Sequence, residues 1–200
     1  CSQSRGLGDV YKRQKPYCDD PHNYGFLRTD IKDLKYYANE IAGMGFQMNT
    51  HAIGDSTVSV LLKEYQKVLN DIEDPRWRIE HSQVVDLNEF ELYNDKILPS
   101  VQPTHATSDM YWAYDRLGKR IDGAYAFKDL LSQSKRIALG TDFPVEKVNP
   151  FHTFYSSIER KDLNGYPENG FQIENALTRE ETLKGMTCLL YTSPSPRDWL

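Results

Sequence analysis

Residues 46–55 read Phe-Gln-Met-Asn-Thr-His-Ala-Ile-Gly-Asp, and they join a predicted strand to the start of a predicted helix. Residues 46–50 are typical of a β-strand that ends at His51, and Asp55 or Ser56 is placed to cap a helix directly afterwards. Apolar residues then recur at helical spacing, at Val58, Leu61, Leu62, Tyr65, Val68 and Leu69. A strand followed at once by an amphipathic helix is the repeating unit of a parallel α/β fold.

The same alternation extends in both directions from this stretch. Further strands are predicted at 77–81, 97–101 and 137–140. Helices are predicted from Asp30 to Gly43 and at 87–93, 109–117, 126–131 and 151–159, and a capping box at Thr178–Glu181 opens a last helix. Strands that alternate with helices predict an α/β protein with a parallel sheet.

Polar residues stand at the predicted strand ends at regular intervals. His51 and His81 are 30 positions apart, and Asp142 follows His81 by 61 positions. A (β/α)8 barrel uses about 31 residues per unit, so these intervals match one unit and two units. The spacing therefore predicts that the three residues lie at the C-terminal ends of strands n, n+1 and n+3, on the face where barrel enzymes carry their chemistry.

These three residue types suit a hydrolytic metal site. Imidazole nitrogens and carboxylate oxygens bind Zn²⁺, and such an ion lowers the pKa of water toward neutrality. A carboxylate beside that water can accept its proton and pass it to a leaving group. His51, His81 and Asp142 are therefore candidate metal ligands, with Asp142 also the candidate catalytic residue; each histidine taken alone remains open to interpretation as a core residue.

The two ends of the chain have a different character. Residues 4–14 and 188–198 resemble translations of the two strands of one sequencing adapter, although natural tails remain the alternative. We therefore expect residues 1–14 and 188–200 to be adapter-derived and disordered. The natural segment is then 15–187.

Composition excludes several classes of function. The net charge is −5, and it becomes −7 without the two ends, because residues 1–14 carry three basic and one acidic side chain and 188–200 carry one of each. An acidic chain argues against nucleic acid as a partner. Cys18 is the single cysteine between the ends, which excludes a disulfide framework or a CxxC zinc site there. No apolar run approaches the roughly 18 residues of a membrane helix.

Four ordered motifs carry a family resemblance. They are Thr50-His-Ala-Ile-Gly-Asp55, Arg78-Ile-Glu-His81, Val101-Gln-Pro-Thr-His-Ala-Thr-Ser-Asp109 and Gly140-Thr-Asp-Phe-Pro-Val-Glu146. Together they resemble successive signatures of the amidohydrolase 3 (YtcJ-like) family. The resemblance implies a partial TIM barrel comprising about strands five to eight, one or two divalent metals, usually zinc, and hydrolysis of non-peptide carbon–nitrogen bonds in a small amide-type substrate.

Carried over by residue, the resemblance assigns the metal ligands after strands five and six to His51 and His81. It assigns Asp142 to the strand-eight aspartate that contacts metal and shuttles the proton. The HxH pair after strand one and the lysine of strand four have no counterpart here, and we expect both to lie upstream of Lys15. The chain is accordingly expected to be a C-terminal-half fragment that is inactive alone.

Three further residues are candidates for substrate binding: Gln102, His105 and Asp109. His105 follows the third strand and could polarise the scissile carbonyl, with an exposed loop histidine as the alternative. For Asp109 the favoured alternative is a cap for the helix predicted at 109–117.

Other functions remain open at this point. The same site could serve a deaminase or a phosphotriester hydrolase. A glycosidase-like barrel could use Asp142 with Glu80, although the strand-end histidines would then be unexplained. The chain could also be a truncated translation product without function.

Overall fold

The computed structural model describes residues 14–187. The predicted adapter-derived ends therefore lie outside the described residues, apart from Gln14. The backbone N–H of Gln14 donates to Asp55 Oδ1 at 3.0 Å, so this residue does contact the folded part.

Four parallel strands form one sheet in chain order: β1 (Asn49–Ala52), β2 (Trp77–His81), β3 (Ile97–Val101) and β4 (Ala138–Leu139). A sheet whose spatial order equals its chain order, with helices in the crossovers, is the arrangement of a TIM barrel. The predicted α/β class and partial barrel are thus confirmed. The bounds of β2 and β3 agree with the prediction, whereas β1 and β4 are shorter than predicted.

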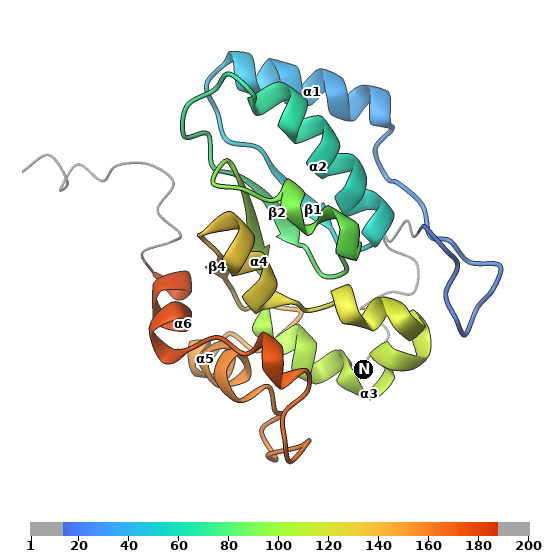
Figure 1. Cartoon of the computed structure of the whole chain (residues 1–200), viewed down its shortest axis with the longest axis vertical. Helices are drawn as coiled ribbons and strands as arrows, with labels where there is room; N and C mark the ends of the chain where they lie inside the picture. Colours follow the sequence, from blue (N-terminus) through green and yellow to red (C-terminus); the bar gives the residue numbers. More distant parts are fainter. Residues whose placement is uncertain (1–13, 188–200) are drawn as a thin grey trace, which may run out of the picture.

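Helices occupy each crossover between the described strands, and further helices precede β1 and follow β4. They are α1 (Ile31–Gly43), α2 (Asp55–Leu69), α3 (Pro103–Leu117), α4 (Phe127–Ser134), α5 (Pro150–Glu159) and α6 (Arg179–Met186), with 3-10 helices η1 (Leu87–Leu92), η2 (Gly118–Gly123) and η3 (Ile173–Asn175). Helices α1 and α2 lie side by side at one end of the molecule, and α5 and α6 lie at the other (Figure 1). Within residues 14–187, no helix combines the length and apolarity that crossing a membrane requires.

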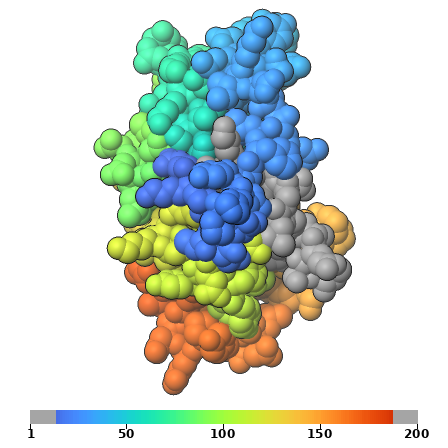
Figure 2. Space-filling model, turned by 90° about the vertical axis from the view of Figure 1, so that its right-hand side faces the viewer, coloured from blue at the N-terminus to red at the C-terminus, as the bar shows by residue number. Residues whose placement is uncertain are grey.

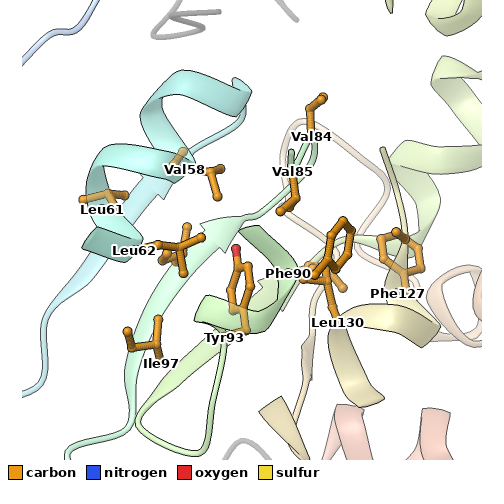
Figure 3. Close-up of a cluster of buried hydrophobic side chains, with 14 of the residues drawn as sticks. Val58, Leu61, Leu62, Val84, Val85, Phe90, Tyr93, Ile97, Phe127 and Leu130 are labelled. Carbon is orange, nitrogen blue, oxygen red and sulfur yellow. The ribbon is translucent and has the colours of Figure 1, made fainter. Parts of the chain in front are cut away.

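The hydrophobic core lies between the sheet and the helical layer formed by α2, η1 and α4 (Figure 3). Apolar side chains from all of these elements meet there, among them Val58, Leu62, Val84, Phe90, Ile97, Phe127 and Leu130. Trp77 and Ile79 of β2 are also fully buried, and the Trp77 ring meets Tyr65 edge-on with centroids 4.8 Å apart. Burial of this kind is the main stabilising contribution to the fold.

Helix α3 differs from the prediction. It begins at Pro103 rather than at Asp109, with Pro103 at the first helical position, where the missing N–H costs nothing. Asp109 therefore lies inside the helix, and the interpretation of Asp109 as a helix cap is wrong. The predicted cap of α2 is wrong as well, because the N-cap is Gly54 rather than Asp55 or Ser56. Asp55 is the first residue of the helix, and its side chain accepts from the backbone N–H of Ser56 at 2.9 Å.

The segment before α1 crosses the outside of α3 and η2 (Figure 2). The backbone N–H of Cys18 donates to the Arg116 carbonyl at 3.0 Å. The guanidinium of Arg120 donates to the carbonyl oxygens of Lys15 and Pro16, each at 2.8 Å. These bonds join the N-terminal part of the described chain to the elements that follow β3.

The last helix packs tightly against β4. A side chain at Gly185 would place its Cβ only 2.8 Å from Leu139 Cγ, so this close approach requires glycine. The predicted capping box is confirmed: Thr178 Oγ1 accepts from the Glu181 N–H at 3.1 Å, and Glu181 Oε2 accepts from the Thr178 N–H at 2.8 Å.

The contribution of the capping box to stability can be tested by substitution at Thr178. Thr178→Ala leaves the N–H of Glu181 without its acceptor, so we expect the free energy of unfolding to fall by about 1 kcal/mol. Thr178→Ser retains the oxygen and should stay within a few tenths of a kcal/mol of the wild type. Urea unfolding of the complete protein, followed by circular dichroism, measures both; equal stabilities for the two variants would show that the cap contributes nothing.

Candidate metal centre

The parallel register places the C-terminal ends of the strands at one edge of the sheet. His51 and Ala52 of β1 lie opposite Glu80 and His81 of β2. His105 lies in the first turn of α3, directly after β3, and Asp142 follows β4. Each candidate residue therefore comes from a different βα unit, but all reach the same edge.

At this edge three imidazoles and one carboxylate come together. The ring of His81 meets that of His51 edge-on, with centroids 4.4 Å apart, and is stacked beside that of His105, with centroids 5.6 Å apart. His105 Nε2 lies 3.5 Å from Asp142 Oδ2. Within residues 14–187, the ligand-type atoms of His81, His105 and Asp142 all lie within 4.8 Å of one another.

This geometry agrees only in part with the arrangement predicted from spacing. It brings His81 and Asp142 together, and it places His51 against His81 but outside the group of three. The observed group also includes His105, which the sequence suggests as a substrate-binding residue. The signal for His105 was the same strand-end position that singled out the other two histidines.

His81 has the properties of a metal ligand. It is 7% exposed, and burial lowers its pKa to about 4, while a hydrogen bond with the Gln102 side chain acts in the opposite direction. Its Nδ1 is buried without a hydrogen-bond partner among the described residues. A neutral imidazole with a buried, unsatisfied nitrogen fits a divalent cation, because a metal binds the neutral form.

The backbone at the site is unusual. His81, Ser82 and Asp142 have φ angles of +72°, +44° and +56°, in the left-handed region that non-glycine residues rarely adopt. Each such residue costs on the order of 1–3 kcal/mol and persists only where surrounding structure enforces it. The turn at the end of β2 and the turn that carries Asp142 are therefore held by their contacts.

The turn that carries Asp142 is fixed at two places. The Asp142 carbonyl accepts from the N–H of Val145 at 2.8 Å, which closes the turn. Ser108 Oγ of α3 then donates to Glu146 Oε1 at 2.7 Å. This second bond joins the turn to the helix that carries His105.

The remaining candidates lie around this centre. Asp109 is buried and accepts from the Tyr125 hydroxyl at 2.9 Å. Gln102 contacts His81, as described above, and substrate binding by Gln102, His105 and Asp109 stays a prediction. Glu80, the second carboxylate of the glycosidase interpretation, forms an ion pair with Arg78 at 3.4 Å.

Comparisons with known proteins identify a family and several relatives. A family profile described as "Amidohydrolase family" matches residues 6–188. The chain is 34% identical over 165 residues to "Putative amidohydrolase YtcJ" of Bacillus subtilis, covering 78% of this chain and 30% of that protein. It is 33% identical over 149 residues to "Protein LONG AFTER FAR-RED 3" of Arabidopsis thaliana, covering 72% of this chain and 26% of that protein.

Two solved structures share the fold. An uncharacterized metal-dependent hydrolase from Pyrococcus horikoshii superimposes with a TM-score of 0.75 at 27% identity, covering 88% of this chain and 35% of that one. A second, from Pyrococcus furiosus, gives a TM-score of 0.73 at 26% identity and covers 87% and 34%. The chain thus spans about a third of the length of the proteins that it matches.

The buried His81 predicts how the metal-free protein responds to acid. Its pKa falls from 6.5 to about 4 on folding, so between these values the unfolded state binds more protons than the folded state. The free energy of unfolding is therefore at its full value above about pH 6.5. It falls by on the order of 3 kcal/mol as the pH is lowered to about 4.

Urea unfolding of the complete protein with a chelator, at about pH 7 and about pH 4.5, measures this loss. His81→Leu should lose less stability between the two pH values than the wild type does. His22→Gln, which alters an exposed histidine, should behave like the wild type. Equal losses for His81→Leu and the wild type would contradict the assignment.

Proposed function

Because this chain belongs to the amidohydrolase family, we propose that the protein containing it is a metal-dependent hydrolase of non-peptide carbon–nitrogen bonds, acting on small amide-type substrates. The observation that carries the proposal is the close group of His81, His105 and Asp142 at the C-terminal edge of the sheet. The matched relatives are about three times as long as this chain, so the proposal concerns the complete protein.

His81 and Asp142 would hold the metal ion, together with His51 from the sequence assignment or His105 from the observed group. Three protein ligands of this type, with a position left for water, are the usual set of a catalytic zinc site, so we propose Zn²⁺. When bound, such an ion lowers the pKa of water and polarises a carbonyl group.

Asp142 is proposed as the residue that moves the proton. Its side chain is about one-third exposed, so it reaches both the buried histidines and the open edge of the sheet. It lies 3.5 Å from His105 Nε2, so the two groups can share a proton or a substrate atom. In this role Asp142 accepts a proton from water and donates it to the departing nitrogen, as a general base and then a general acid.

The polar residues beside the centre would orient the substrate. His105 is nearly buried but its ring faces Asp142, which suits a donor to the scissile carbonyl. Gln102 lies at the start of α3, beside His81. These side chains come from the unit after β3, so the substrate would lie between this unit and the turn at Asp142.

Asp142→Asn tests the proton-transfer role in the complete protein. The amide keeps an oxygen for the metal but cannot accept the proton, so we expect most of the metal to remain and kcat to fall by about 10²–10⁴-fold. Metal content is measured by plasma mass spectrometry, and turnover on a panel of N-acyl and formamide substrates. Asp122→Asn, at an exposed position, is the matched control and should be fully active. Near-normal kcat in Asp142→Asn with metal bound would refute the role.

The 200-residue chain by itself should be inactive. Within residues 14–187, β1 and β4 each pair on one side only, and exposed strand edges promote association. The HxH pair that the family resemblance places on strand one is also missing. We therefore expect aggregated material without stoichiometric zinc, and recovery of soluble, zinc-loaded protein when the upstream half is co-expressed. A soluble, cooperatively melting chain with zinc-dependent amide hydrolysis would contradict this expectation.

A further inference from the structure

Three buried tyrosines lie on elements outside the sheet and bond to residues near the site histidines. Tyr65 lies on α2, Tyr93 directly after η1, and Tyr125 between η2 and α4. Their exposed fractions are 0%, 2% and 1%, so all three rings are packed in the core. Figure 3 shows Tyr93 standing among apolar side chains such as Leu62 and Phe90. Phenylalanine would satisfy this packing equally well, which leaves the hydroxyl groups to be explained.

Each hydroxyl is hydrogen-bonded to a polar residue beside one of the site histidines. Tyr65 shares a hydrogen bond of 2.6 Å with the side chain of Thr50, and the Tyr93 hydroxyl donates to Ser82 Oγ at 2.8 Å. The third hydroxyl, of Tyr125, donates to Asp109 Oδ2 at 2.9 Å. Thr50 precedes His51, Ser82 follows His81, and Asp109 lies one helical turn after His105.

We propose that Tyr65, Tyr93 and Tyr125 are positioning residues, each fixing through its hydroxyl the backbone next to one histidine of the metal centre. This inference rests on the proposed function, because it concerns the same site. The three tyrosines act through other residues and contact neither substrate nor metal in this proposal.

The first hydrogen bond, between Thr50 and Tyr65, joins strand β1 to helix α2. Successive side chains of a β-strand point to opposite faces, so Thr50 is directed toward α2 while His51 is directed to the other face. The bond to Tyr65 therefore ties the backbone of β1 to the helix behind it. Without this bond, the hydroxyl of Thr50 would lose the hydrogen-bond partner that α2 provides.

The second hydrogen bond supports the left-handed turn at the end of β2. Ser82, with φ +44°, receives the Tyr93 hydroxyl and itself donates to the Ile79 carbonyl at 3.0 Å. This chain of two bonds is buried and holds the residue that follows His81. The unusual backbone of His81 and Ser82 is thus compensated by Tyr93.

The third hydrogen bond links two units of the sheet. Besides bonding Asp109, the Tyr125 hydroxyl accepts from Gln83 Nε2 at 3.0 Å, and the Tyr125 N–H donates to the Gln83 carbonyl at 2.8 Å. Gln83 lies two residues after His81, whereas Asp109 belongs to the helix of His105. Gln83 Nε2 also donates directly to Asp109 Oδ2 at 3.3 Å, so Tyr125 reinforces an existing link between the units that carry the two histidines.

Tyrosine-to-phenylalanine variants of the complete protein test the proposal. Each removes one oxygen and retains the ring, so the fold should persist. We expect each of the three to weaken zinc binding by the apo-protein and to lower kcat, in both cases by about tenfold, with little change in KM. Zinc affinity is measured by competition with a chromophoric chelator, and this measurement requires no substrate.

Tyr17→Phe is the matched control, because Tyr17 is also buried but lies in the segment before α1, where the Arg116 guanidinium lies 5.6 Å from the centre of its ring. It should lower the Tm about as much as the other three variants while zinc affinity and kcat stay at the wild-type level. Two variants of Thr50 test the hydrogen bond to Tyr65 from its other side. Thr50→Val removes the hydroxyl and should weaken zinc binding, whereas Thr50→Ser keeps the hydroxyl and should bind zinc like the wild type. Zinc affinity and kcat within twofold of wild type in all three tyrosine variants, or an equal loss in Tyr17→Phe, would overturn the proposal.

The outcome separates this inference from the proposed function. If the wild-type protein binds no zinc, or if His81→Ala binds it as tightly as the wild type, the proposed function fails and the inference fails with it. If His81→Ala loses zinc while the tyrosine variants behave like the wild type, the positioning role alone is refuted.

Discussion

The parallel register of four short strands is the constraint on which the rest of this structure depends. Adjacent parallel strands must end at the same edge of the sheet, so residues that are distant in sequence but equivalent in their βα units become neighbours. His51 and Asp142 are 91 positions apart in sequence, yet both reach the edge where His81 and His105 meet. The site is a consequence of sheet geometry before any specific contact is considered.

The layer behind the sheet supplies the second requirement, which is rigidity. A metal centre built on turns needs those turns to be held, and two of them contain non-glycine residues with positive φ. The bond from Ser108 to Glu146 holds the turn of Asp142, and the core tyrosines occupy equivalent places near the histidines. The same side chains that form the core therefore also bond to polar side chains near the site histidines.

Much of this architecture could be predicted from the sequence, because hydrophobic spacing records which faces are buried. Strands β2 and β3, the capping box at Thr178, and the approach of His81 to Asp142 follow from local pattern and from the length of a βα unit. The start of α3 could not be predicted, because its first turns are polar, and the burial of Thr104, His105 and Thr107 depends on tertiary packing. Because the helix was predicted to begin at Asp109, the position of His105 in its first turn could not be predicted either. The positive φ angles of His81 and Asp142 were also not predictable, because backbone φ angles leave no signal in the pattern of side chains.

The central claim is that His81 and Asp142 hold one divalent ion at this edge. Anomalous X-ray diffraction at the zinc edge, from crystals of the complete protein grown with zinc, tests it most directly. We expect an anomalous peak within bonding distance of His81 and Asp142, with His51 or His105 as a further ligand. A protein that binds zinc at another place, or crystals with an intact fold and no peak at these residues, would contradict it.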